Sequence, residues 1–349
     1  MKRNLILFIA ILFLINGVAF AKDAAMELSF SHAIDLMEKN NTALQIAQIN
    51  YKIATIDYEK AKASNLMSAS RHSEMQAEHN FAKAKNTYEN SKRSAYLELL
   101  KNYTNVLSAE QSVQIREHEL IVAENNYKIM QEKIRIGDAG RIDDLQEMNK
   151  VESARRSLKA AQQKLDEETR DLKRFLGLSE NTVVELSFDF SVPELEKTQD
   201  ESIELGLENS FTLRDLKYNL EQQERQLETA KIEGIPPMDL ERSQLSLEIA
   251  RLNFEKEQSD ITDNIIAQHQ GLIDSTDRFA NIEREWEIAQ ETYDIYRRQE
   301  EIGLITEIQL LQHKVSLLNS EANRKDAIVA HIISYLQFQN TLGLEGSLQ

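Results

Sequence analysis

The chain has 349 residues, a formal net charge of −17 and a mean hydropathy of −0.48, and it contains no cysteine. The lack of cysteine excludes disulfides, thiolate metal sites and a lipid anchor on an N-terminal cysteine, and the acidic balance argues against nucleic acid or anionic lipid as a partner. Glycine and proline are scarce, with 10 and 3 residues, and the abundance of Ala, Glu, Lys, Leu, Gln and Arg is typical of long helices.

The N-terminus has the pattern of a signal peptide. Lys2 and Arg3 precede a short apolar run, and residues 19–21 (Ala-Phe-Ala) offer a small-residue cleavage site. The alternative is an uncleaved N-terminal anchor, for which the apolar run is short. We therefore expect residues 1–21 to be removed and the protein to be exported, with a net charge of −19 after cleavage. The mature chain has no further apolar run of the length of a bilayer span, so no membrane span is predicted in it.

The rest of the chain contains two copies of one unit. At an offset of 169 the matching residues are Ile34, Leu36, Asn40, Leu44, Ala61 and Lys62 with Ile203, Leu205, Asn209, Leu213, Ala230 and Lys231. At an offset of 166 they are Ala123, Tyr127, Ile129, Ile136, Gly137, Leu145 and Gln146 with Ala289, Tyr293, Ile295, Ile302, Gly303, Leu311 and Gln312. Because composition alone does not keep a constant register over such distances, we infer a duplication. The first helical repeat is placed at 22–180, a connector at 181–200 and the second repeat at 201–349.

Each copy is predicted to contain the same four helices. A short amphipathic helix comes first, over residues 31–40 or 201–209, and the next helix carries apolar residues at alternating spacings of three and four. A very long helix follows, from about Ser73 to Ile136 in the first copy, which would span roughly 95 Å at 1.5 Å per residue. A return helix closes each copy. Apolar residues on these helices recur every seven positions, as in a coiled-coil seam: Val113, Leu120, Tyr127 and Ile134; Val151, Leu158, Leu165 and Leu172; Val315, Ala322, Val329 and Leu336.

Helix breakers mark the connections. Gly234 with residues 236–237 (Pro-Pro) indicates the turn before the second long helix, and the equivalent turn of the first copy is placed between residues 64 and 74. Pro193 lies in the connector, whose residues 183–188 have the composition of a short strand.

The ends of the long helices carry motifs of a known family. Gly137, Gly140 and Gly303 lie where a positive φ is needed to reverse the chain. Residues 136–146 read Ile-Gly, a short turn, acidic residues and Leu-Gln, and residues 302–304 read Ile-Gly-Leu. Each copy also begins with a short helix ending in two polar residues and closes on Leu-Gly-Leu. In this duplicated order, the chain resembles the TolC family of outer-membrane efflux proteins over essentially its whole mature length.

The resemblance implies an all-α fold of duplicated long antiparallel α-helical hairpins of coiled-coil type, forming a TolC-like periplasmic helical barrel and closing as a homotrimer. In the family, each copy also inserts two β-strands between its second and third helices, and three chains close a β-barrel across the outer membrane. A strand that spans the membrane in such a barrel needs about 9–11 residues of alternating character. Only residues 64–75 and 233–241 are available here, so we expect the β-barrel strands to be absent.

The resemblance also implies roles for the hairpin tips. In the family these tips dock a periplasmic adaptor (membrane fusion protein), which meets an inner-membrane transporter, and nearby acidic residues narrow the pore. Gln309 is the counterpart of Asp143, and Asp138 stands where the family has a Leu after Gly137. The alternative is that these residues only reverse the helices and carry solvated charges. The candidates for adaptor docking are Ile136, Gly137, Ile302, Gly303 and Leu304, and those for an acidic constriction are Asp143 and Asp144.

One histidine pair invites a metal hypothesis. A helix would place His72 and His79 on one face, close to Glu74 and Glu78. The spacing fixes no third ligand, and an exposed polar turn is the favoured interpretation, so no metal site or cofactor is predicted. The sequence also lacks a Gly-rich phosphate loop, a nucleophile elbow and paired catalytic carboxylates, and we do not expect an enzyme.

Two functions remain. The leading one is a component of envelope efflux or secretion, a periplasmic α-helical duct that is associated with the outer membrane according to the family resemblance. The alternative is an extracytoplasmic coiled-coil scaffold without transport activity. A closed tunnel needs apolar faces on both sides of its helices, whereas a single hairpin bundle needs one seam. Ile53 and Ile56, beside the apolar stripe of the second helix, favour more than one neighbour.

Overall fold

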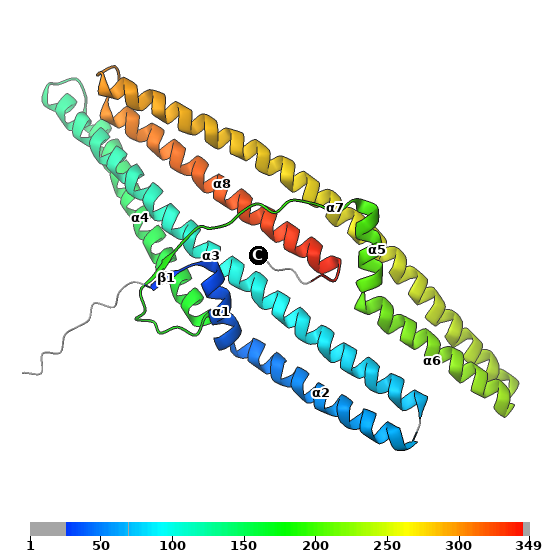
Figure 1. Ribbon diagram of the computed structural model, residues 1–349. Coiled ribbons are helices and arrows are strands. Elements are labelled where there is room, and N and C mark those ends of the chain that lie inside the picture. Colours follow the sequence, from blue (N-terminus) through cyan, green and yellow to red (C-terminus); the bar gives the residue numbers. More distant parts are fainter. Residues whose placement is uncertain (1–25, 69, 345–349) are drawn as a thin grey trace, which may run out of the picture.

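The structure, a computed structural model, describes residues 26–68 and 70–344, so the predicted signal peptide lies outside the described residues. In this part of the chain, helices and strands form an elongated layer of long helices (Figure 1). Their bounds are β1 Met26–Leu28, α1 Phe30–Asn40, α2 Thr42–Ser68, α3 Arg71–Arg135, α4 Arg141–Phe175, β2 Val184–Leu186, α5 Gln199–Asn209, α6 Phe211–Glu233, α7 Pro237–Glu301 and α8 Glu307–Thr341.

The two copies repeat each other closely, which confirms the predicted fold class. Helices α3 and α7 have 65 residues each, α4 and α8 have 35 each, and α1 and α5 have 11 each. The side-chain amide of Asn40 donates to the carbonyl oxygen of Leu176 at 3.1 Å, and that of Asn209 donates to Leu342 at the same distance. The same amide therefore holds the end of the return helix in both copies.

The long helices lie side by side, as Figure 1 shows. Helix α3 packs against α4 over one half of the layer and against α2 over the other, and α7 packs in the same way against α8 and α6. Contacts of α3 with α8, and a smaller set with α6, join the copies. The order across the layer is therefore α4–α3–α8–α7 in one half and α2–α3–α6–α7 in the other. This leaves α2 and α4 at one edge and α7 at the opposite edge.

The main core lies at the middle of the layer. Strand β1 pairs in parallel with β2, with Leu28 opposite Leu186, so the predicted strand forms and its partner is the segment just before α1. Tyr103 of α3 is fully buried beside it, and its hydroxyl lies 2.7 Å from the carbonyl oxygen of Leu28 and 2.8 Å from that of Ser187. Other side chains without exposed area here are Ala33, Met37, Leu99, Leu100, Leu172, Leu176 and Ile332.

The connector between the copies crosses α8 and α7 on its way to α5 (Figure 1). Two buried histidines hold its backbone. His331 of α8 has Nε2 2.9 Å from the carbonyl oxygen of Pro193, and His269 of α7 has Nε2 3.2 Å from that of Lys197. The remaining nitrogen of His331, Nδ1, lies 3.1 Å from the hydroxyl of Ser275. Each nitrogen of the buried His331 ring thus has a partner, as burial requires.

The turns at the far end of the layer are short. Helix α2 ends at Ser68 and α3 begins at Arg71, within the range predicted for that turn. Gly234 has a φ of 64° after α6, and Pro237 is the first residue of α7, as the breakers predicted. No strand lies at either connection among the described residues. Among residues 26–68 and 70–344, no helix combines the length and the apolar character needed to cross a membrane.

Candidate functional site: the hairpin tips

Both long hairpins reverse at the same end of the layer (Figure 1). Gly137 has a φ of 82° and Gly303 a φ of 75°, whereas the positive φ predicted for Gly140 is wrong, because this residue is extended with a φ of −110° as the N-cap of α4. The backbone N–H of Asp138 donates to the carbonyl of Lys133 and that of Leu304 to Gln299, each at 2.8 Å. This closure needs a left-handed residue after the helix. A Cβ at either glycine would meet nothing within 4 Å, so the glycines are required by backbone conformation and not by packing.

Apolar side chains project from these turns into solvent. Ile136 is 69% exposed, Ile302 is 72% exposed and Leu304 is 71% exposed. Ile142, in the first turn of α4, is 72% exposed and was not among the predicted residues. The structure therefore brings the docking candidates of both copies to one end of the molecule, where they form an exposed apolar surface.

The acidic candidates lie in the first turn of α4. The carboxylate of Asp143 accepts a hydrogen bond from the backbone N–H of Gly140 at 2.9 Å. Its counterpart Gln309 accepts from the N–H of Thr306, also at 2.9 Å. An amide therefore performs the same capping in the second copy, which explains why the acid is not repeated there. Asp144 is half-buried in the same turn, where the helix dipole favours negative charge.

Substitution of Asp143 separates capping from charge. Asp143→Asn keeps an oxygen that accepts from Gly140, and we expect its free energy of unfolding to match that of the wild type within about 0.5 kcal/mol. Asp143→Ala removes the acceptor and is expected to lower the free energy of unfolding by about 1 kcal/mol. Urea unfolding monitored by circular dichroism measures both. Equal losses in the two variants would contradict the capping role.

The histidine pair near the α2–α3 turn is not assembled into a metal site. His79 Nε2 lies 3.0 Å from a carboxylate oxygen of Asp215, and its ring stacks on Tyr218 with a centroid distance of 4.2 Å. His79 thus links α3 to α6 across the two copies. In the part of the chain that the structure describes, no group of three His, Asp or Glu side chains is placed to hold a metal ion.

Both edges of the helix layer carry unpartnered apolar stripes. On α2 the isoleucines at 46, 49, 53 and 56 are 51–55% exposed, although this helix packs its other face on α3. On α7 the stripe was not predicted, and its seven-residue spacing is the signal that could have revealed it. Its members are Leu245, Ile249 and Leu252 in one half and Ile288 and Ile295 in the other, and Ile302 continues the spacing just after the helix end.

Comparisons with known proteins agree with this architecture. Residues 65–178 match the family model described as outer membrane efflux protein. The search of curated proteins finds no match. Among solved structures, the chain is similar to the CmeC outer membrane channel of Campylobacter jejuni, with 14% identity, 90% of this chain and 85% of that chain covered, and a TM-score of 0.59.

Two further structures show the same fold. The outer membrane protein VceC of Vibrio cholerae has 12% identity and a TM-score of 0.63, with 90% of this chain and 96% of that chain covered. The MtrE outer membrane channel of Neisseria gonorrhoeae, in its open state, has 13% identity and a TM-score of 0.58, with 90% and 89% covered. The family match and the shared fold together confirm the resemblance drawn from the hairpin motifs: this chain is similar to TolC-family outer membrane efflux proteins.

Proposed function

We propose that the chain forms the helical duct of an envelope efflux or secretion system. Three copies close a tunnel in the periplasm or cell envelope, associated with the outer membrane. The family match over residues 65–178 and the channels that share the fold support an efflux role of this kind. Specificity for the cargo then lies mainly in the transporter that the duct meets through an adaptor.

The observation that carries the proposal is the pair of apolar edges. A helix at the edge of a finished bundle has one apolar face, turned to the core, and a polar face in water. Here α2 has a second apolar stripe facing away from α3, and α7 has one at the opposite edge of the layer. Because the two edges differ, the α2 edge of one copy would pack on the α7 edge of the next copy, which is a head-to-tail contact. Such contacts close into a ring when the rotation between neighbouring copies permits it.

The tips provide the proposed docking surface for the adaptor. Ile136, Ile302 and Leu304 supply exposed apolar area, and the turns at Gly137 and Gly303 leave the backbone open to close approach. In the proposed ring, Asp143 and Asp144 lie near the same end and form the acidic constriction. The capping role of Asp143 is compatible with this, because the cap uses one oxygen of the carboxylate.

The first test is the mass of the particle. Residues 22–349, purified without detergent, are measured by light scattering coupled to size-exclusion chromatography. We expect a particle with three times the mass of the chain. A monomer at all concentrations would contradict the closed duct and favour a scaffold without transport activity.

A further inference from the structure

An arginine with buried, unpaired nitrogens lies in the contact between α3 and α6, where the two copies meet. The guanidinium of Arg225, on α6, reaches across to α3 and has Nη1 3.2 Å from the sulfur of Met75. Its other two nitrogens, Nε and Nη2, are buried and make no hydrogen bond within the described part of the chain. Because a thioether is a weak acceptor, the loss of hydration at this charged group is left almost uncompensated.

A second unpaired donor lies one helical turn away. Gln222 precedes Arg225 by three residues on α6, which places both side chains on one face of the helix. Four buried side-chain nitrogens lack a partner among residues 26–68 and 70–344, and three of them are Gln222 Nε2 and the two nitrogens of Arg225. All three carry N–H groups, so the group that this contact lacks is a hydrogen-bond acceptor.

The carboxylate on the same face of α6 is already paired. Asp215 has an oxygen 3.0 Å from Nε2 of His79. It precedes Arg225 by ten residues, which is roughly 15 Å along the helix, so it does not reach the guanidinium as well. On α3, Glu74 and Glu78 are exposed, and neither accepts a hydrogen bond from the two buried nitrogens. The chain therefore supplies no acid to this arginine.

The duplication shows that these polar side chains are not needed to build the repeated unit. At the offset of 169 residues, Gln222 and Arg225 correspond to Ile53 and Ile56 on α2. The first copy thus forms the same helix with apolar side chains at both positions. The second copy has two donors there and turns them into its contact with α3. Packing does not explain a buried guanidinium at this position, and a bound anion would.

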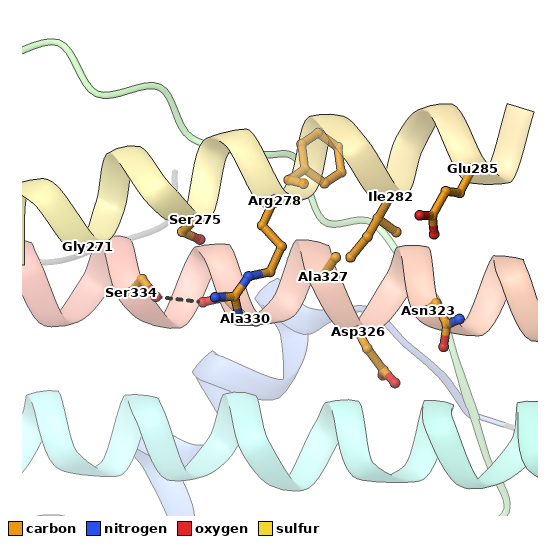
Figure 2. A pocket seen from close by; sticks show the side chains of 11 residues that line it. Gly271, Ser275, Arg278, Ile282, Glu285, Asn323, Asp326, Ala327, Ala330 and Ser334 are labelled. Atoms are coloured by element: carbon orange, nitrogen blue, oxygen red, sulfur yellow. Dashed lines mark hydrogen bonds between the residues drawn. The ribbon is translucent and has the colours of Figure 1, made fainter.

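The groove between α7 and α8, with a volume of about 440 Å³, shows the contrast (Figure 2). Arg278, Glu285 and Asp326 line this groove, and Asp326 is turned toward α3 and away from Glu285. All three side chains are exposed, so water compensates their charges. Charged groups in that groove need no ligand, whereas the buried nitrogens of Arg225 lack any such compensation.

We propose that Arg225 and Gln222 bind a small carboxylate in the contact between α3 and α6. Nε and Nη2 lie on one edge of the guanidinium and donate two parallel hydrogen bonds to the two carboxylate oxygens. Nε2 of Gln222 donates a third. A singly charged anion suits the site better than a doubly charged one, because Glu74 and Glu78 lie nearby on α3.

The ligand reaches the site by a small separation of α3 from α6, which share much less contact than α3 shares with α8. Once bound, the carboxylate holds the two copies together at this end of the layer. The site lies within one chain, so it does not depend on ring closure or on the proposed duct.

The methyl group of Met75 is a local probe of binding. The mature protein is labelled with carbon-13 at its methionine methyl groups, and acetate is titrated against chloride at constant ionic strength. We expect the Met75 signal, assigned with Met75→Leu, to shift saturably with a dissociation constant in about the millimolar range. Met148, 40% exposed on α4, is the internal control and should not shift. No saturable shift at Met75, as when water alone satisfies the donors, or an equal shift at Met148, would overturn the proposal.

Variants on α6 locate the site. Arg225→Ile and Gln222→Ile install the residues of the first copy, and we expect both to fold, as monitored by circular dichroism. Arg225→Ile should abolish the saturable shift of Met75, and Gln222→Ile should weaken binding about tenfold, the equivalent of one hydrogen bond to a charged group. Arg225→Lys keeps the charge without the planar fork and should also bind at least about tenfold more weakly.

Arg214→Ile is the matched control, because it removes an exposed arginine from the same helix, and it is expected to bind acetate as the wild type does. In chloride alone, Arg225→Ile should unfold at no lower urea concentration than the wild type, because an apolar side chain replaces a buried charge without a partner. A folded Arg225→Ile variant whose Met75 signal shifts with the dissociation constant of the wild type would contradict the assignment.

Discussion

Replacement of Tyr103 by alanine is expected to lower the free energy of unfolding by about 4 kcal/mol, since it removes a buried aromatic ring and its hydrogen bonds. The ring is fully buried between α1 and the connector. It contacts Phe30 edge-on, with the two ring centroids 5.4 Å apart. Its hydroxyl also accepts from the backbone N–H of Ser187 at 3.1 Å. One side chain thus joins β1, α3 and the connector. Denaturant unfolding at fixed protein concentration measures the loss.

Tyr103→Phe isolates the hydroxyl. We expect a loss of about 1–2 kcal/mol, because polar backbone groups of Leu28 and Ser187 remain buried without their partner. Tyr51→Phe is the matched control: Tyr51 contacts Phe81 and Tyr88 through its ring, and a change below about 0.5 kcal/mol is expected. Equal effects of the two Tyr→Phe substitutions would show that the Tyr103 hydroxyl does not anchor the connector.

The Tyr103 hydroxyl also gives a pH dependence. Burial raises its pKa, so the folded protein holds this proton more tightly than the unfolded chain does. Its contribution to stability is therefore complete below the ordinary tyrosine pKa of about 10 and falls as the pH rises past that value. The stability difference between the wild type and Tyr103→Phe should narrow at alkaline pH. A difference that widens would contradict this sign.

The helices were predictable because their information is local and periodic. The second long helix was placed after residues 236–237 and begins at Pro237, and the first was placed over 73–136 and runs over 71–135. Sevenfold spacing and helix breakers suffice for this, because each long helix packs on its sequence neighbour. The hairpin motifs at Gly137 and Gly303 were equally local, so the tips could be placed at helix ends from the sequence alone.

The features missed in the sequence depend on distant partners. The sequence predicted no role for His269 and His331, because each binds a backbone carbonyl, 72 and 138 residues away. A carbonyl is present at every residue and leaves no mark in the sequence. The capping by Asp143 differs, because its spacing from Gly140, and that of Gln309 from Thr306, is a readable capping pattern.

Replacement of one edge isoleucine by glutamate is expected to dissociate the proposed ring. Ile49→Glu on α2 would place an unpaired carboxylate in an apolar contact, and we expect the dissociation constant to rise about a hundredfold or more. Gln48→Glu is the matched control, because it adds the same charge at the adjacent exposed position, beside the stripe. Leu245→Glu and Gln244→Glu form the equivalent pair on α7. Light scattering at several protein concentrations measures all four.

Mixing the two edge variants tests the head-to-tail contact itself. Ile49→Glu keeps an intact α7 edge and Leu245→Glu keeps an intact α2 edge, so together they can form one good contact and no closed ring. We therefore expect each variant alone to be a monomer and the mixture to form a one-to-one dimer. If α2 instead paired with α2 of a second copy, Leu245→Glu would dimerise alone and mixing would add nothing. That result would rule out the tunnel, because a contact between identical edges ends at two copies.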